Sequence, residues 1–290
     1  MKLWILAGLV LAAVAIASCG GLAFTAANTP ALFGDFKRRA DLSFGTHERQ
    51  RLDVYSPDSR AGGSEGRPMI VFWYGGSFDK GRKEQYRFVG AALAKAGYVA
   101  VLPDYRLYPE ARFPAFVDDG ADAVAWVVSH AREFGGDPAR VYLAGHSAGA
   151  HLAAMLAYDA DRLVRVGVRP GTVRGYIGLS GPYALDPNTD ALRTIFSLPY
   201  GFDDWQPWRH VSGGAPRALL LHAEGDTLVS VEHTRTMAKA LVAANVAVTL
   251  RIYPERGHAD TVAAFAAAAP GKLPVLAEIR RFIEGDLPGR

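Results

Sequence analysis

The sequence predicts an α/β fold with a mostly parallel central sheet and helices on both faces. Short, nearly continuous apolar runs, typical of strands buried on both sides, alternate with longer segments of helical pattern. This alternation is typical of parallel strands joined by crossover helices. Apolar residues make up 50% of the 290 residues, enough for the core of one large domain.

The first 19 residues are predicted to be an export signal of the lipoprotein type. Lys2 is followed by an uncharged, mostly apolar run from Leu3 to about Ala27. Residues 16–19 (Ile-Ala-Ser-Cys) resemble a bacterial lipobox, and Cys19 is the only cysteine in the chain, without a partner for a disulfide. We expect lipidation of Cys19 and a periplasmic or cell-envelope location at a membrane. An uncleaved anchor and plain secretion remain alternatives.

Residues 20–40 are predicted to be a tether, because small residues and the basic patch Lys37-Arg38-Arg39 precede the first globular pattern. A catalytic domain is expected over residues 41–290. The net charge is +3 and the arginines are scattered, so no nucleic-acid partner is expected.

The elements of the domain follow in chain order. Strands are predicted at Arg51–Tyr55, Met69–Trp73, Val99–Leu102, Val141–Ala144, Gly175–Leu179, Ala218–His222 and Val248–Tyr253. Helices are predicted at Glu84–Ala96, Ala115–Glu133, Ala148–Tyr158, Val231–Ala243 and Leu273–Glu284. In open parallel sheets, functional sites form at the carboxyl ends of the strands.

Gly145-His146-Ser147-Ala148-Gly149 fits the pattern G-x-S-x-G between a predicted strand and a predicted helix. This context requires a tight, strained turn with small neighbours, which lifts the serine hydroxyl out of the sheet at the positive end of a helix. Ser147 is therefore the candidate nucleophile.

A serine hydroxyl needs a base to remove its proton, and in this architecture the chain order is nucleophile, acid, base. Four histidines lie far enough downstream: His210, His222, His233 and His258. His258 is the candidate base, because it follows the last apolar strand on a glycine-containing loop. His222 ends a strand and is expected to be buried.

The acid that orients the base is expected after the preceding strand. Asp226 lies in the turn that follows the apolar run ending at His222. Its carboxylate would hold the imidazole tautomer and stabilise the imidazolium. Glu224 is the alternative acid.

Tyr74-Gly75-Gly76-Ser77 follows the apolar strand Met69–Trp73. Glycines in this position let backbone N–H groups approach a ligand closely. With the Ala148 N–H, Gly75 and Gly76 are predicted to form an oxyanion hole.

An aromatic-rich insertion between the strands Gly175–Leu179 and Ala218–His222 is predicted to form a small cap over Ser147. Phe78, Tyr86 and Trp205 are the candidate substrate-binding residues of the pocket wall. No P-loop and no histidine pair at metal-ligand spacing is found, so no metal or other cofactor is expected.

Together these motifs resemble the α/β-hydrolase fold, and within it the esterase/lipase group with an H-G-G-G-type oxyanion loop. That group includes carbohydrate esterases, kynurenine formamidases and isoprenylcysteine methylesterases. Further stretches share the resemblance: Leu102-Pro103-Asp104-Tyr105-Arg106, Phe134-Gly135-Gly136-Asp137-Pro138 and Gly178-Leu179-Ser180-Gly181. The chain departs from the group where Tyr74 replaces the histidine and Ser77 the third glycine.

The resemblance implies a serine esterase that cleaves small carboxylic esters through an acyl-enzyme formed by Ser147, His258 and Asp226. An amidase or formamidase with the same triad is the main alternative. A non-catalytic binding protein on the same scaffold is a further one, although no triad residue or elbow glycine is missing.

Overall fold

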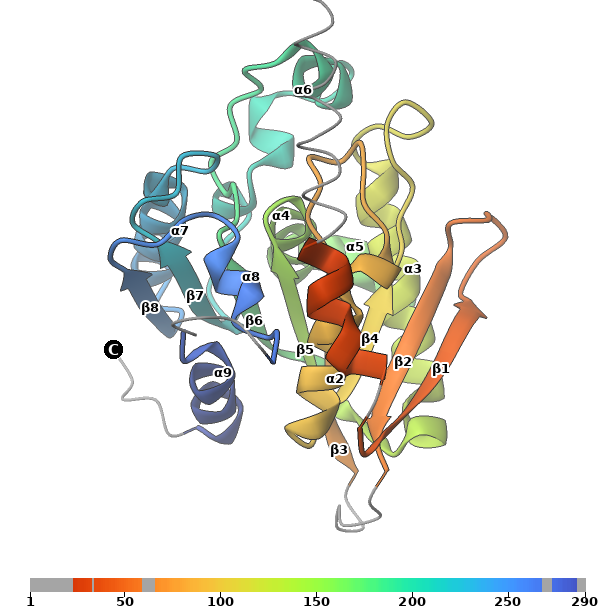
Figure 1. Ribbon diagram of the computed structural model, residues 1–290. Coiled ribbons are helices and arrows are strands. Elements are labelled where there is room, and N and C mark those ends of the chain that lie inside the picture. The colour runs from red at the N-terminus through yellow and green to blue at the C-terminus, as the bar shows by residue number, and fades with distance from the viewer. Residues whose placement is uncertain (1–22, 33, 59–65, 268–272, 286–290) are drawn as a thin grey trace, which may run out of the picture.

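The computed structural model describes residues 23–32, 34–58, 66–267 and 273–285. Its framework is an eight-stranded sheet with the strand order β1-β2-β4-β3-β5-β6-β7-β8 (Figure 1). β2 pairs antiparallel with both β1 and β4, and every other pair of neighbours is parallel. The strands are β1 (Phe36–Ser43), β2 (Arg51–Pro57), β3 (Arg67–Trp73), β4 (Val99–Pro103), β5 (Gly136–His146), β6 (Val173–Leu179), β7 (Arg217–Ala223) and β8 (Val248–Tyr253).

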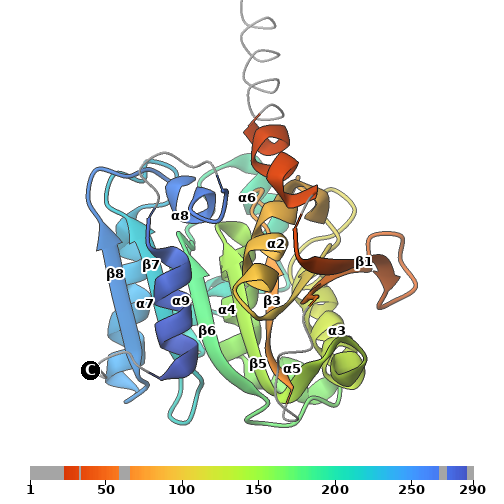
Figure 2. The same cartoon turned by 60° about the horizontal axis from the view of Figure 1, so that its bottom comes forward.

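Helices cover both faces of the sheet, as the sequence predicted. α2 and α9 lie on one face, and α3, α4 and α7 lie on the other (Figures 1 and 2). The α-helices are α2 (Arg87–Lys95), α3 (Ala115–His130), α4 (Ala148–Tyr158), α5 (Ala160–Arg165), α6 (Asp190–Ile195), α7 (Val231–Ala243), α8 (Asp260–Ala263) and α9 (Val275–Glu284). Short 3₁₀ turns are η1 (Thr29–Leu32), η2 (Lys83–Tyr86), η3 (Ala131–Phe134), η4 (Phe202–Trp205) and η5 (Pro207–Arg209).

The core lies around β3, β5 and α4. Every residue of α4 is buried, because the helix packs between the sheet and α3. A helix that is apolar on all sides belongs in a core, and its alanines let it approach β5 and β6 closely. The predicted strands inside β2 to β8 are confirmed, and α4 and α7 have the predicted bounds.

The predicted domain boundary at residue 41 is wrong, because β1 spans Phe36–Ser43 and belongs to the sheet. The strand was missed because it carries Lys37-Arg38-Arg39 and is mostly exposed. Charged side chains are common on edge strands, where they prevent pairing with a further chain.

The predicted tether over residues 20–40 also needs correction from residue 23 onward. Residues 23–28 are helical (red in Figure 1), and the Asn28 side chain donates to the carbonyls of Glu84 (3.1 Å) and Gln85 (3.0 Å). The predicted signal segment, including Cys19, lies outside the described residues. None of the helices in the described part of the chain combines the length and apolar character needed to cross a membrane.

A small cap, the segment between β6 and β7, contains α6, η4 and η5, and α6 lies beyond the carboxyl ends of the strands (Figure 1). Its buried Phe196 and Trp205 pack together with ring centroids 5.6 Å apart. His151 of α4 donates through Nε2 to the Trp205 carbonyl over 2.7 Å. The cap is therefore fixed to α4, the helix that directly follows Ser147.

Candidate active site

Ser147 occupies a sharp turn between β5 and α4. Its φ is 55° and its ψ is −125°, a backbone conformation that costs a non-glycine residue free energy. A Cβ at Gly145 would collide with the Gly149 carbonyl, and one at Gly149 would collide with the Trp73 carbonyl. The two glycines are thus required for the turn, and the half-buried Ser147 stands at its tip.

His258 and Asp226 form a hydrogen-bonded pair. The distance between His258 Nδ1 and Asp226 Oδ2 is 2.7 Å. Burial alone would raise the pKa of Asp226, but hydrogen bonds from His222, His258 and the Val229 amide lower it below its usual range. Asp226 is therefore ionised and accepts the Nδ1 proton, which leaves Nε2 as the ring nitrogen of His258 that can act as the base.

This pair lies beside the serine turn. His146, the residue before Ser147, has its Nε2 3.1 Å from the His258 carbonyl oxygen, and the two rings are 4.8 Å apart between centroids. Ser147, Asp226 and His258 thus come from the loops after β5, β7 and β8, which end at one edge of the sheet.

The other predicted candidates lie elsewhere. His210 donates to the Asp204 carbonyl within the cap, and His233 accepts the Ala184 N–H on α7. Glu224 pairs with Arg235 at the surface over 2.9 Å. The geometry therefore places Asp226, and not Glu224, against His258.

His222 is buried, as predicted, but it also contacts the acid. Its Nε2 lies 2.9 Å from the Val229 carbonyl and 3.3 Å from Asp226 Oδ2, and its Nδ1 lies 2.6 Å from Thr234 Oγ1. The sequence predicted that His222 is buried at the end of a strand, but it predicted no contact between His222 and Asp226. Its position four residues before Asp226, with both side chains at one strand end, was the available signal.

The Gly75-Gly76 loop touches the serine turn directly. A Cβ at Gly75 would lie 2.9 Å from Ser147 Cβ and 3.1 Å from His146 Nδ1. The Gly75 N–H donates to Tyr86 Oη over 3.3 Å, which argues against its predicted role as an oxyanion donor. Ala148 begins α4, where N–H groups lack an intrahelical partner. In the described part of the chain, the Gly76 amide makes no hydrogen bond either.

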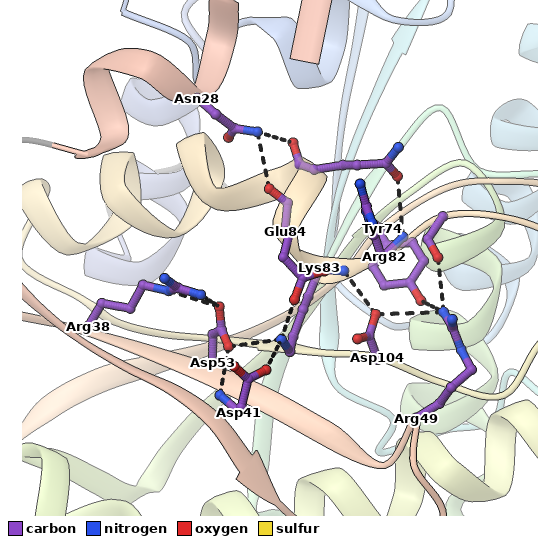
Figure 3. Close-up of polar contacts among 12 residues, drawn as sticks. Asn28, Arg38, Asp41, Arg49, Asp53, Tyr74, Arg82, Lys83, Glu84 and Asp104 are labelled. Atoms are coloured by element: carbon purple, nitrogen blue, oxygen red, sulfur yellow. Dashed lines mark hydrogen bonds and ion pairs between the residues drawn. The ribbon is translucent and has the colours of Figure 1, made fainter. Parts of the chain in front are cut away.

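Tyr74, which replaces the histidine of the related loop, is buried. Its hydroxyl is held by Arg49 (Figure 3). Its hydroxyl accepts from Arg49 Nη2 over 2.8 Å, and its ring stacks on Tyr105 with centroids 4.7 Å apart. Arg49 also donates to the carbonyls of Gly81 (2.9 Å) and Tyr105 (2.8 Å). Burial raises the pKa of Tyr74 well above its usual value, so the phenol stays neutral.

A buried lysine anchors the neighbouring turn η2. Lys83 Nζ lies 2.6 Å from Asp41 and 3.2 Å from Asp53, and it also contacts Glu84 (Figure 3). Burial would lower the pKa of Lys83, but hydrogen bonds to Asp41 and Glu84 raise it above its usual value. The turn that carries Tyr86 is therefore tied to β1 and β2.

The predicted pocket residues are all buried in this structure. Phe78 packs edge-on against Phe196 of the cap (5.1 Å between centroids) and against His151 (5.4 Å). Trp205 belongs to the same aromatic cluster, whereas Tyr86 contacts Gly75 and His146. Their role in substrate binding stays a prediction.

The strand order and the serine turn are those of an α/β hydrolase. The crystal structure of esterase B from Lactobacillus Rhamnosis (HN001) superposes with a TM-score of 0.79 at 19% identity, covering 97% of this chain and 94% of that one. Apo Thermogutta terrifontis esterase 2 gives a TM-score of 0.72 at 23% identity, covering 88% and 96%.

Within this fold the chain belongs to the prolyl oligopeptidase family, whose model matches residues 114–271, more than half of the sequence. The BD-FAE family model matches residues 52–168. Together the two matches include Gly75, Ser147, Asp226 and His258.

Curated relatives are named as esterases. The "Probable isoprenylcysteine alpha-carbonyl methylesterase ICMEL2" of Arabidopsis thaliana is 30% identical over 245 residues, which are 77% of this chain and 57% of the relative. "Esterase LipC" of Mycobacterium tuberculosis is 29% identical over 225 residues, 71% of this chain and 55% of the relative. The chain thus spans little more than half the length of these relatives.

Proposed function

We propose that this protein is a serine hydrolase that cleaves small carboxylic esters through an acyl-enzyme. The observation that carries the proposal is the Asp226–His258 pair, held by His146 beside the strained Ser147. The esterase names of the curated relatives support an ester as the bond that is cleaved.

In the first step, Ser147 Oγ attacks the acyl carbon while His258 Nε2 takes its proton. Ionised Asp226 stabilises the resulting imidazolium. In this proposal the Gly76 and Ala148 amides donate to the oxyanion of the tetrahedral intermediate. Collapse of this intermediate breaks the ester C–O bond, and His258 returns the proton to the departing alcohol.

In the second step, His258 takes a proton from water, whose oxygen attacks the acyl-enzyme carbonyl. The second tetrahedral intermediate breaks the bond to Ser147 Oγ, and His258 protonates that oxygen. The products are a carboxylic acid and the free enzyme, so no metal or redox cofactor enters either step.

The nucleophile is tested by labelling and turnover. Ser147→Ala should lower kcat by a factor of about 10⁴ or more and abolish labelling by a fluorophosphonate. Matched ester and amide substrates are measured in parallel. Retained activity with labelling at another serine would contradict the assignment, and faster turnover of N-formyl or aryl amides would favour an amidase.

We further propose a short acyl group as substrate. The cap is short, and its buried Phe196 packs against Phe78, Phe113 and Phe116 of the domain below it. Each buried CH₂ stabilises binding by only ~0.8 kcal/mol, which a clash with a packed wall outweighs. We expect kcat/KM for p-nitrophenyl esters to peak between acetate and butyrate and to fall beyond about eight carbons. A steady rise to palmitate would indicate a lipase lid instead.

Lipidation of Cys19 and attachment to a membrane of the cell envelope are proposed from the sequence. Incorporation of radiolabelled palmitate in a bacterial host should be lost in Cys19→Ser. A mature protein that still begins at Met1 would favour the uncleaved anchor.

A further inference from the structure

Two buried side chains, Tyr86 and His146, lie between the loops that carry Gly75, Ser147 and His258. Tyr86 ends the turn η2 and His146 ends β5, and each side chain belongs to a residue only 5% exposed. Buried polar groups cost free energy unless they are hydrogen-bonded. Their partners therefore indicate what the two residues do.

The His258 carbonyl fixes the tautomer of His146. A carbonyl oxygen can only accept, so His146 Nε2, at 3.1 Å, must carry the proton. Burial lowers the pKa of His146 to about 3, so the ring is neutral near pH 7. Nδ1 of the same ring is then an acceptor.

The Tyr86 hydroxyl connects this ring to the oxyanion loop. Its Oη lies 3.4 Å from His146 Nδ1 and accepts the Gly75 N–H over 3.3 Å. Since Nδ1 has no proton, the hydroxyl proton points toward it. Each hydrogen bond therefore runs in one direction, from Gly75 through Tyr86 and His146 to the backbone of His258.

We propose that Tyr86 and His146 are positioning residues that hold the Gly75 loop and the His258 loop in a fixed relation to Ser147. The proposal rests on the serine-hydrolase function proposed above and deepens it. His258 is held at two points, since Asp226 fixes its ring and His146 fixes its backbone. The same series of hydrogen bonds fixes Gly75, which precedes Gly76. In the proposed mechanism the Gly76 amide donates to the developing oxyanion.

Single substitutions test this series of hydrogen bonds. Tyr86→Phe removes only the hydroxyl, and kcat for p-nitrophenyl butyrate should fall about 3- to 30-fold with little change in KM. His146→Leu should cost more, because both bonds of the ring are lost. His146→Gln keeps an N–H₂ group for the His258 carbonyl and should recover part of the loss.

Tyr158→Phe is the matched control. The Tyr158 hydroxyl is buried and has no partner in the described part of the chain. Its removal should leave kcat within about two-fold, and thermal melts should confirm that all variants fold. Wild-type kcat in folded Tyr86→Phe and His146→Leu would overturn the proposal.

A double-mutant cycle separates a linked chain from independent packing. Tyr86→Phe should lower kcat by a clearly smaller factor in the His146→Leu background than in the wild type, because the series of hydrogen bonds is already interrupted there. Losses that simply multiply would overturn the proposal.

Two further measurements keep this proposal distinct from ester hydrolysis itself. Long-range ¹H–¹⁵N NMR of histidine-labelled protein should show His146 protonated on Nε2 and unprotonated on Nδ1 at pH 7. The opposite tautomer would overturn the proposed series of hydrogen bonds.

If the wild type reacts with a fluorophosphonate but hydrolyses no ester, only the ester proposal fails. Slower labelling of Tyr86→Phe than of Tyr158→Phe would then still support positioning, and equal rates would overturn it.

Discussion

At the residue scale, Asp226 is the most heavily hydrogen-bonded side chain of the site. One carboxylate oxygen accepts the amides of Leu228 (3.0 Å) and Val229 (2.9 Å), and the other faces His258 and His222. These donors favour the ionised form, so the stabilisation that they give is present above the usual Asp pKa, about 3.9, and is lost as the pH falls below it.

Asp226→Asn should reduce kcat by about 10³- to 10⁴-fold with a smaller effect on KM, because an amide no longer selects the Nδ1–H tautomer of His258. Glu224→Gln is the control, since Glu224 pairs with Arg235 at the surface. A larger loss in Glu224→Gln than in Asp226→Asn would identify Glu224 as the acid.

A second residue-scale effect concerns stability. Burial lowers the pKa of His151 to about 4 and that of His146 to about 3, below the unfolded value of about 6.5. Between these limits the unfolded chain binds protons that the folded protein does not. The folded state therefore loses stability as the pH falls from about 6.5 toward 4.

The free energy of unfolding, measured by urea titration between pH 7.5 and 4.5, should show this loss. His151→Gln should reduce the slope of this free energy against pH by about 1.4 kcal/mol per pH unit, which is the contribution of one proton. An unchanged slope would mean that His151 is protonated in the folded state.

At the scale of elements, hydrophobic periodicity predicted those helices and strands whose pattern lies in their own sequence. β3 to β8 are recognisable by their apolar runs, and α4 by its small apolar residues. β1 was missed because it is an edge strand with charged, exposed side chains and lacks the apolar run of a core strand. The helix at residues 23–28 was missed because its role depends on η2, almost sixty residues away in sequence.

Asn28 provides the test of that helix. Its side chain donates to Glu84 and Gln85 and accepts the Phe88 N–H over 2.9 Å. Asn28→Ala should lower the free energy of unfolding by about 1–3 kcal/mol. Thr29→Ala, which removes one exposed local bond to the Thr25 carbonyl, should change it by less than about 0.5 kcal/mol. Equal effects in urea titrations would contradict docking through Asn28.

At the scale of the whole molecule, the position of Ser147, Asp226 and His258 on loops at one edge of the sheet was predictable, because parallel strands bring their carboxyl ends to one edge. The supports behind them were not. Arg49 reaches Tyr74 across 25 residues of sequence, and His146 reaches His258 across 112. No spacing rule identifies such pairs, because they depend on how the loops pack in three dimensions.

The docked helix at residues 23–28 limits how far the folded domain can move from the membrane if Cys19 carries lipid. Phe24 packs on Tyr86 with centroids 5.5 Å apart, and Tyr86 touches the oxyanion loop. The five peptide steps from Cys19 to Phe24 span at most about 18 Å when fully extended. The proposed nucleophile, Ser147, would then stay close to the bilayer and meet esters by diffusion in two dimensions along its surface. On vesicles, the acylated protein should hydrolyse bilayer-bound esters faster than Cys19→Ser, while both should cleave dissolved p-nitrophenyl butyrate at the same rate.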